Sequence, residues 1–132
     1  MANYNLGVKY SNGLGVAADK ARAVGYYRKA AEAGYRKAQF QLGYAYDTGE
    51  GIGQDDQLAT GWYEKAAAQG HAEANRNLGV KYSTGRGVAV DKARAVGYYR
   101  KAAEAGYAEA QYLLGYAYST GEGIGRDDQL AI

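Results

Sequence analysis

Cysteine and proline are both absent from the 132 residues of this chain, and histidine occurs only once. Without cysteine there is no disulfide framework, no thiol nucleophile and no cysteine-based metal site. The single histidine, His71, follows Gly70 at a position that Tyr35 and Tyr107 fill elsewhere in the chain. We therefore interpret His71 as a turn or packing residue, and we expect neither a Ser-His-Asp triad nor a histidine-rich metal site.

Long apolar runs and phosphate-binding motifs are missing too. No segment reaches the ~20 apolar residues that a membrane span needs, and the N-terminal stretch MANYNLGVKY has no apolar core of a signal peptide. The segment GEGIG at 49–53 resembles a phosphate loop only superficially, because no strand precedes it and no Lys-Ser/Thr pair follows. We predict a non-enzymatic, cytoplasmic protein that needs no metal or cofactor and has no membrane partner.

Glycine and tyrosine, by contrast, are abundant, with 20 and 15 occurrences. The segment DKARAVGYYRKAAEAGY stands at 19–35 and again, letter for letter, at 91–107. Inside this repeat lies a shorter one of 36 residues, which is marked by the leucines Leu6, Leu42, Leu78 and Leu114, each followed by glycine. A fixed period of this size is typical of a solenoid, in which single units cannot bury their own apolar faces.

Each 36-residue unit reads as two helices. In the second unit, Ala38, Leu42 and Ala45 share one helical face and predict a helix over about 38–48. Glycines then permit a tight turn, Asp55 is suited to cap a second helix, and Gly70 marks the end of that helix. We predict an all-α fold with a single domain over 1–132, made of repeats at 2–37, 38–73 and 74–109 and a truncated fourth repeat at 110–132.

Glycine also falls in the middle of each predicted second helix, at positions 25, 61 and 97. A glycine inside a helix costs roughly 1 kcal/mol relative to alanine. We expect these glycines to allow close approach of neighbouring helices.

The residues of the second unit, AQFQLGYAYDTGEGIGQDDQLATGWYEKAAAQGHAEA, resemble the Sel1-like repeat of the tetratricopeptide-like superfamily. They carry its pattern A-x-x-x-L-G-x-x-Y, its G-x-G turn, its aspartate and its A-x-x-W-Y-x-K-A-A-x-x-G segment, and several of these anchors recur in all four units. The resemblance implies a right-handed α-solenoid of antiparallel helix pairs, with the first helix of each pair on the concave side. It further implies an adaptor for proteins or peptides.

Charge alternates from one repeat to the next. The net charge is +5 over 2–37, −5 over 38–73, +4 over 74–109 and −2 over 110–132. Two interpretations remain open: the alternation favours the correct order of neighbouring repeats, or the charges merely keep the outer faces solvated. In either case no continuous basic stripe is available for a nucleic-acid backbone, so we expect no nucleic-acid partner.

Aromatic residues recur two positions before and after the leucine of the first helix, on the side that points away from the core. Exposed aromatic rings in a groove are typical of peptide recognition. An alternative is that the rings only pack on the neighbouring helix. We predict that a peptide-binding groove on the concave face is lined by Phe40, Tyr44, Asp47, Arg76, Tyr112 and Tyr116.

Two further hypotheses follow from the copying itself and from the ends of the chain. Residues 2–60 and 74–132 differ at only 11 of 59 positions, which fits an engineered or fragmentary repeat scaffold with no physiological ligand. The chain stops at DDQLAI, before a partner for its last helix, so we expect weak self-association through Leu113, Leu114 and Tyr118. Head-to-tail stacking of acidic and basic end repeats is the other arrangement expected.

Overall fold

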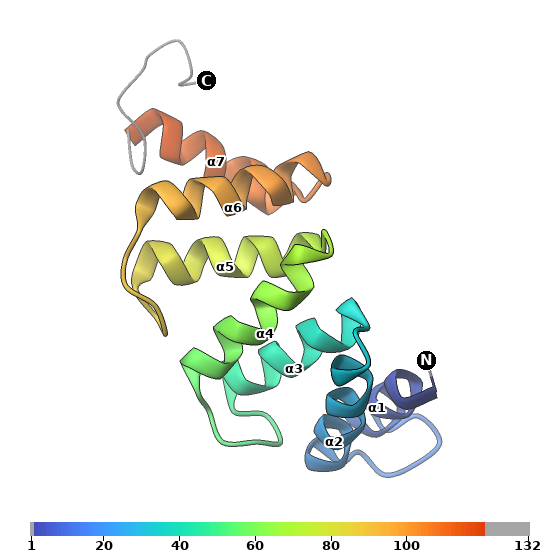
Figure 1. The fold of residues 1–132 in the computed structure, drawn as a ribbon. Coiled ribbons are helices and arrows are strands. Elements are labelled where there is room, and N and C mark those ends of the chain that lie inside the picture. Colours follow the sequence, from blue (N-terminus) through green and yellow to red (C-terminus); the bar gives the residue numbers. More distant parts are fainter. Residues whose placement is uncertain (1, 121–132) are drawn as a thin grey trace.

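The computed structural model describes residues 2–120 of the chain, and within that range it contains seven α-helices and no strand (Figure 1). The helices are α1 (Ala2–Asn12), α2 (Lys20–Glu32), α3 (Arg36–Thr48), α4 (Asp56–Ala68), α5 (Ala72–Thr84), α6 (Lys92–Glu104) and α7 (Ala108–Thr120). The predicted all-α class is confirmed. The residues after Asp127 and the side chain of Tyr118, which the predicted self-association involves, lie outside the described residues. Leu113 and Leu114 are partly buried against the core.

The boundaries of the helices follow from their capping residues. The predicted cap is confirmed at α4, where the Asp55 side chain accepts a hydrogen bond of 3.1 Å from the Leu58 N–H. Helix α3 begins at Arg36, two residues earlier than predicted. The prediction missed this start because the N-cap residue, Tyr35, makes no side-chain capping bond and is not a typical capping residue. Gly49 ends the same helix in the left-handed conformation, at φ 78°.

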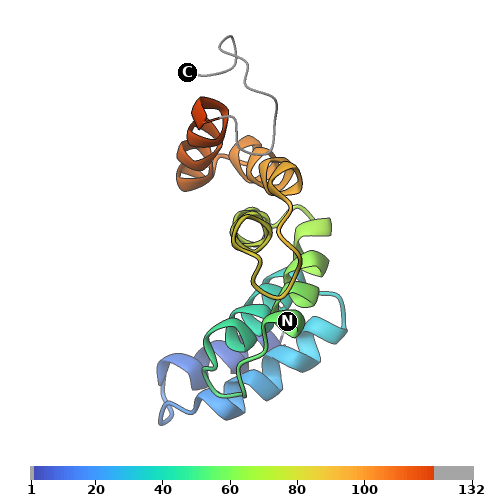
Figure 2. The same ribbon diagram turned by 90° about the vertical axis from the view of Figure 1, so that its left-hand side faces the viewer.

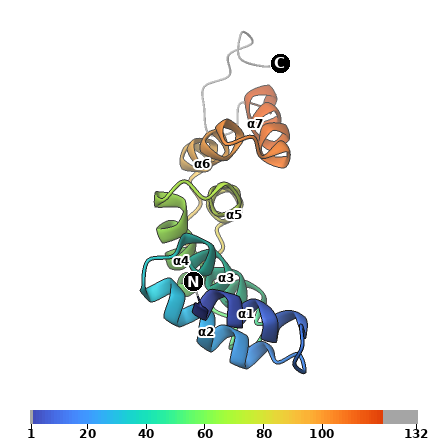
Figure 3. The same cartoon turned by 90° about the vertical axis from the view of Figure 1, so that its right-hand side faces the viewer.

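The helix pairs are arranged as an arc. Each helix packs chiefly against its neighbours along the chain. The odd-numbered helices line the inner side of the arc, and the even-numbered helices lie on its outer side (Figures 2 and 3). The contact between the α1–α2 and α3–α4 pairs is called the first junction here, and the contact between the α3–α4 and α5–α6 pairs the second junction.

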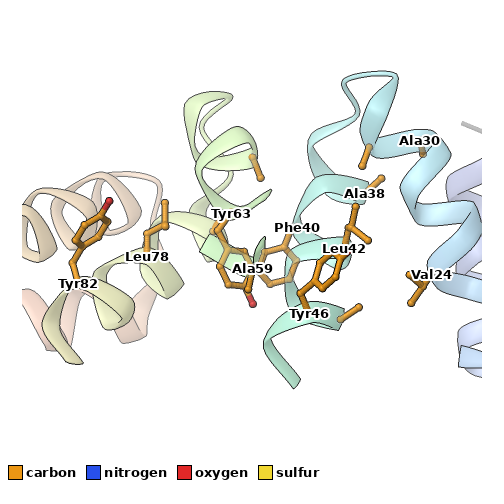
Figure 4. Packing of buried hydrophobic residues seen from close by; sticks show 14 of the residues in the cluster. Val24, Ala30, Ala38, Phe40, Leu42, Tyr46, Ala59, Tyr63, Leu78 and Tyr82 are labelled. Atoms are coloured by element: carbon orange, nitrogen blue, oxygen red, sulfur yellow. The ribbon is translucent and has the colours of Figure 1, made fainter. Parts of the chain in front are cut away.

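The core is built from small residues and tyrosine. Leu42, Leu78 and Tyr63 are fully buried (Figure 4). The ring of Tyr63 lies directly over Gly43, so that a Cβ atom added to Gly43 would stand 2.8 Å from Tyr63 Cδ1. The glycine of the Leu-Gly pair therefore permits the close approach of the two helices in a pair, since any larger residue would displace the ring.

The mid-helix glycines have a different role from the one predicted. A Cβ atom added at Gly25, Gly61 or Gly97 meets no atom within 4 Å. The expectation of close helix approach at these three positions is wrong, because the close approach is made by the Leu-Gly pairs on the opposite helix.

Glycine also shapes both junctions. Gly51 and Gly87 both have φ near 77°, in the left-handed region that favours glycine. A Cβ atom on Gly51 would overlap the carbonyl oxygen of Lys20, and one on Gly87 would overlap that of Asp56. The turn inside the α3–α4 pair and the turn inside the α5–α6 pair therefore each fit against the first turn of the outer helix in the preceding pair.

Among the residues that the structure describes, no helix has both the length and the apolar character required to cross a membrane.

Candidate ligand-binding face

A depression opens on the inner side of the arc between α3, α5 and the start of α7. Its volume is about 340 Å³. Phe40, Tyr44 and Asp47 line it from α3, and Arg76 lines it from α5. The structure thus gathers four of the six predicted site residues around one cavity.

Phe40 forms the floor of the depression rather than an exposed contact. Phe40 is only 8% exposed, and its ring stacks on the imidazole of His71 with a centroid separation of 4.8 Å. It also lies 5.6 Å from the ring of Tyr63 (Figure 4). The prediction that Phe40 is exposed is wrong because the turn before α5 brings His71 over it. Tyr44, at 41% exposed, is the aromatic ring that a ligand can reach.

Asp47 belongs to a cluster of charges that joins α3 and α4 to α5. The ionic cluster consists of Asp47, Asp56, Lys81 and Arg86. Lys81, only 2% exposed, pairs with both carboxylates, and its Nζ lies 2.9 Å from Asp56 Oδ1. Arg86 reaches the same two carboxylates at 3.4 and 3.1 Å. The cluster crosses the second junction and leaves Asp47 with little capacity for a ligand.

The cluster also sets the ionisation of its neighbours. The hydrogen bond from Lys81 lowers the pKa of Asp56 below its usual range. Burial, followed by the charge of Asp47, raises the pKa of Tyr63, whose hydroxyl donates a hydrogen bond of 3.0 Å to Asp47 Oδ2. Asp56 is therefore a charged acceptor at neutral pH, while Tyr63 is a neutral donor.

Arg76 is held at the far side of the depression. Its guanidinium pairs with Glu109 at the start of α7 and donates a hydrogen bond of 3.0 Å to Asn77 Oδ1. Its Nε is buried and has no hydrogen-bond partner among the described residues. Glu73 also lines the depression and forms no ion pair within the described range. This end of the depression therefore offers both a donor and a carboxylate to a ligand.

Tyr112 and Tyr116 lie away from the depression. They are 72% and 54% exposed on α7 and do not line the cavity. A ligand-binding role for these two residues stays a prediction.

His71 is confirmed as a turn and packing residue. It caps the N-terminus of α5, where its Nδ1 accepts a hydrogen bond of 3.2 Å from the Ala74 N–H. Burial lowers its pKa, so the imidazole is the neutral acceptor that the cap requires. In the described part of the chain, no three histidine, cysteine or acidic side chains are grouped so that they could hold a metal ion.

Sequence reasoning missed Lys81 and Arg86, which complete the ionic cluster. The only signal was the alternation of charge between repeats, because Ala45 and Glu50 occupy the equivalent positions one repeat earlier. The alternation gave no indication of which charges meet at the second junction.

Comparison with known proteins places these features in a family. The Sel1 repeat model matches residues 1–35, 36–71, 72–107 and 108–132. No curated protein matches the chain.

Solved structures include close matches to the whole described solenoid. One is c5321, a protective antigen of uropathogenic Escherichia coli with an SLR fold, at 44% identity and a TM-score of 0.94 over 98% of this chain and 28% of that one. Another is a Sel1 repeat protein from Oxalobacter formigenes, at 39% identity and a TM-score of 0.91 over 98% of this chain and 54% of that one. The chain spans less than two thirds of the length of either protein.

A third similar structure is cysteine rich protein B of Helicobacter pylori, at 28% identity and a TM-score of 0.69. The match covers 73% of this chain and 72% of that one. The similarity in fold therefore extends to a protein described as rich in cysteine, although this chain contains none.

Proposed function

The chain belongs to the Sel1 repeat family, and we propose that it is a non-enzymatic scaffold that binds an extended peptide in the depression between α3, α5 and α7. Sel1 repeat proteins are generally scaffolds for protein interaction. The observation that carries the proposal is that the exposed ring of Tyr44 and the charged side chains of Glu73 and Arg76 line one cavity of about 340 Å³.

The lining of the depression suits a peptide better than a small metabolite. An aromatic wall at Tyr44 and an aliphatic side chain at Val80 offer apolar contact, and Glu73 and Arg76 offer one charge of each sign. An apolar side chain of the peptide packs on Tyr44 and Val80. The peptide main chain and a polar side chain form hydrogen bonds with Glu73 and Arg76. Pockets that combine apolar walls with a few placed polar groups are typical ligand sites.

A peptide-library screen tests this proposal. Tyr44→Ala removes an exposed ring without opening the core, whereas Phe40→Ala would also damage packing. Tyr112→Ala is the matched control, since it removes a ring that is more exposed but lies outside the depression. We expect peptides that bind the unaltered chain and the Tyr112→Ala variant but bind the Tyr44→Ala variant at least tenfold more weakly, while circular dichroism shows the same helicity in all three.

Two other results would count against the depression. Equal loss in both variants would extend the binding face to α7, as the sequence predicts for Tyr112. A screen without any bound peptide would favour a repeat scaffold that has no ligand.

A further inference from the structure

The glycines at 25, 61 and 97 each face open space rather than a neighbouring helix. Each lies in the middle of a helix, and an added Cβ would meet nothing. Each is followed by an aromatic ring and then by a lysine whose Nζ lies over that ring, at 5.8 Å for Lys29 and Tyr26, 4.4 Å for Lys65 and Trp62, and 5.6 Å for Lys101 and Tyr98. Because glycine weakens a helix, its repeated use here is explained by the room that it leaves beside the ring.

At Gly97 this room forms a measurable notch. Arg94, Gly97, Tyr98 and Lys101 line this outer notch on α6, with a volume of about 280 Å³. Helix α6 lies on the outer side of the arc, away from the depression (Figure 3). Neither Arg94 nor Lys101 forms an ion pair within the described residues, and the Arg94 guanidinium lies instead 4.6 Å from the ring of Tyr82. Two cations without carboxylate partners therefore flank an empty space.

A second cavity adjoins the outer notch. This hollow, of about 160 Å³, shares Tyr98 and Lys101 with the notch and adds Glu64 from α4 and Asn75 from α5. Asn75 is 2% exposed, and its Nδ2 donates a hydrogen bond of 3.2 Å to the carbonyl of His71. Its Oδ1 is buried and has no partner among the described residues. A buried acceptor without a donor is unfavourable, so Asn75 Oδ1 lacks a hydrogen-bond donor just as the notch lacks an anion.

We propose that the outer notch and the hollow together bind an acidic residue of a peptide segment from a partner protein. The side-chain carboxylate lies between Arg94 and Lys101, where charge-assisted hydrogen bonds are strong. The main-chain N–H of the segment faces the acceptors of the hollow, Asn75 Oδ1 and Glu64.

The site places two cations, Arg94 and Lys101, beside an unpartnered acceptor, Asn75 Oδ1, and this combination favours a peptide over a nucleic acid. A phosphate group would satisfy Arg94 and Lys101 but would bring no donor to Asn75. In addition, the acidic repeat at 38–73 separates the basic surface of α6 from that of α2, so a nucleic-acid backbone finds no continuous basic path.

The chain contains its own control for this site. On α4, Gly61 stands where α6 has Gly97, but Leu58 replaces Arg94 and Gln39 replaces Asn75. The Oε1 of Gln39 already accepts a hydrogen bond of 2.9 Å from Gln69. The space beside Gly61 therefore lacks both the second cation and the unpartnered acceptor.

Fluorescence anisotropy with a labelled 12-residue peptide of alternating Glu and Ala tests the proposal, with the corresponding Lys-Ala and Gln-Ala peptides for comparison. Gly97→Leu fills the outer notch while it raises helix propensity, so a loss of binding in this variant is separate from a loss of fold. Gly61→Leu is the matched control. Because Arg22, Gly25, Tyr26 and Lys29 repeat the residues of the outer notch on α2, every chain in the comparison also carries Gly25→Leu. We expect the Glu-Ala peptide to bind the Gly25→Leu chain and its Gly61→Leu derivative alike, and to bind its Gly97→Leu derivative at least tenfold more weakly.

Three outcomes would overturn the proposal. The first is no preference for the Glu-Ala peptide, and the second is an equal loss of binding in the two glycine variants. The third is a single-stranded oligonucleotide that displaces the peptide at lower concentration and is itself sensitive to Gly97→Leu, which would assign the notch to nucleic acid.

Discussion

The two junctions of the solenoid share one backbone contact but differ in chemistry. In both, a turn glycine with φ near 77° lies against a carbonyl of the preceding outer helix. The four positions of the ionic cluster carry, in the first junction, Ser11, Lys20, Ala45 and Glu50. There the Nζ of Lys20 donates a hydrogen bond of 2.9 Å to Ser11 Oγ, and these four residues form no ion pair with one another.

The difference shows that two separate requirements act on each junction. The glycine contact is geometric and occurs at both junctions. The ionic cluster is specific to the second junction, where the acidic side chains of α3 and α4 meet the basic side chains of α5 and its turn. The alternation of charge therefore joins neighbouring repeats at this junction and is not confined to solvated faces.

Loss of the buried lysine should have the largest effect. Lys81→Ala leaves Asp47 and Asp56 facing each other with only Arg86 between them, and removing one partner of a buried ion pair costs about 3 kcal/mol. The free energy of unfolding, measured by urea titration, should fall by that order.

The double variant Asp47→Ser/Lys81→Ala copies Ser11 and Ala45 of the first junction into the second. It should lose clearly less stability than Lys81→Ala alone, because no uncompensated carboxylate remains at position 47. A loss in the double variant equal to the sum of the losses in Asp47→Ser and Lys81→Ala would show that Asp47 and Lys81 act independently.

Two glycine-to-alanine variants distinguish the stability loss caused by the close backbone contact from the loss caused by left-handed backbone strain. Gly15 and Gly51 have the same φ of 77°, but a Cβ on Gly15 meets nothing within 4 Å, whereas one on Gly51 overlaps the Lys20 carbonyl. Gly15→Ala should therefore cost about 1 kcal/mol from left-handed strain alone. Gly51→Ala should cost about 2 kcal/mol or more, since overpacking is added. Thermal unfolding followed by circular dichroism measures both, and equal losses would contradict the contact at the first junction.

Lowering the pH should reduce the stability of the second junction, which contains the ionic cluster, by a smaller amount than the substitutions above. The pKa of Asp56 is lowered in the folded chain, so its ion pairs stabilise the fold above the ordinary carboxylate value of 3.8. That contribution is lost as the pH falls from 3.8 through the lowered pKa. Stability measured from pH 6 down to pH 2 should decline less steeply in Asp56→Asn than in the unaltered chain, and an unchanged slope would show that Asp56 gains nothing from Lys81.

Much of the fold could be predicted from the sequence because the repeat is strictly periodic. The 36-residue spacing of Leu42 and its equivalents defines the helix pairs, and Asp55 marks a helix start through ordinary capping chemistry. Helical periodicity places Phe40, Tyr44 and Arg76 on one helix face, and the resemblance to the Sel1-like repeat assigns that face to the concave side of the arc. These features depend on local spacing, which the sequence displays directly.

The rest depends on contacts between residues far apart in the chain. Whether Phe40 is exposed is decided by His71, which lies in the next helix pair. Lys81 meets Asp47 across the second junction, and no local pattern reveals that encounter. The mid-helix glycines show a further limit, since Gly43 and Gly61 are both helical glycines, yet only the backbone geometry tells that the first lies under a ring and the second beside open space.

The sequential packing of the helices has a mechanical consequence. Because each helix pair touches chiefly the pairs before and after it, any bending of the arc is the sum of small rotations at its joints. The joint crossed by the Lys81 cluster resists shear through ion pairs. The joint between α2 and α3 resists it through shape and through uncharged-acceptor hydrogen bonds, such as the one of 2.7 Å that Arg28 donates to the Tyr46 hydroxyl. Added salt would therefore soften the joint crossed by the Lys81 cluster more than its neighbour.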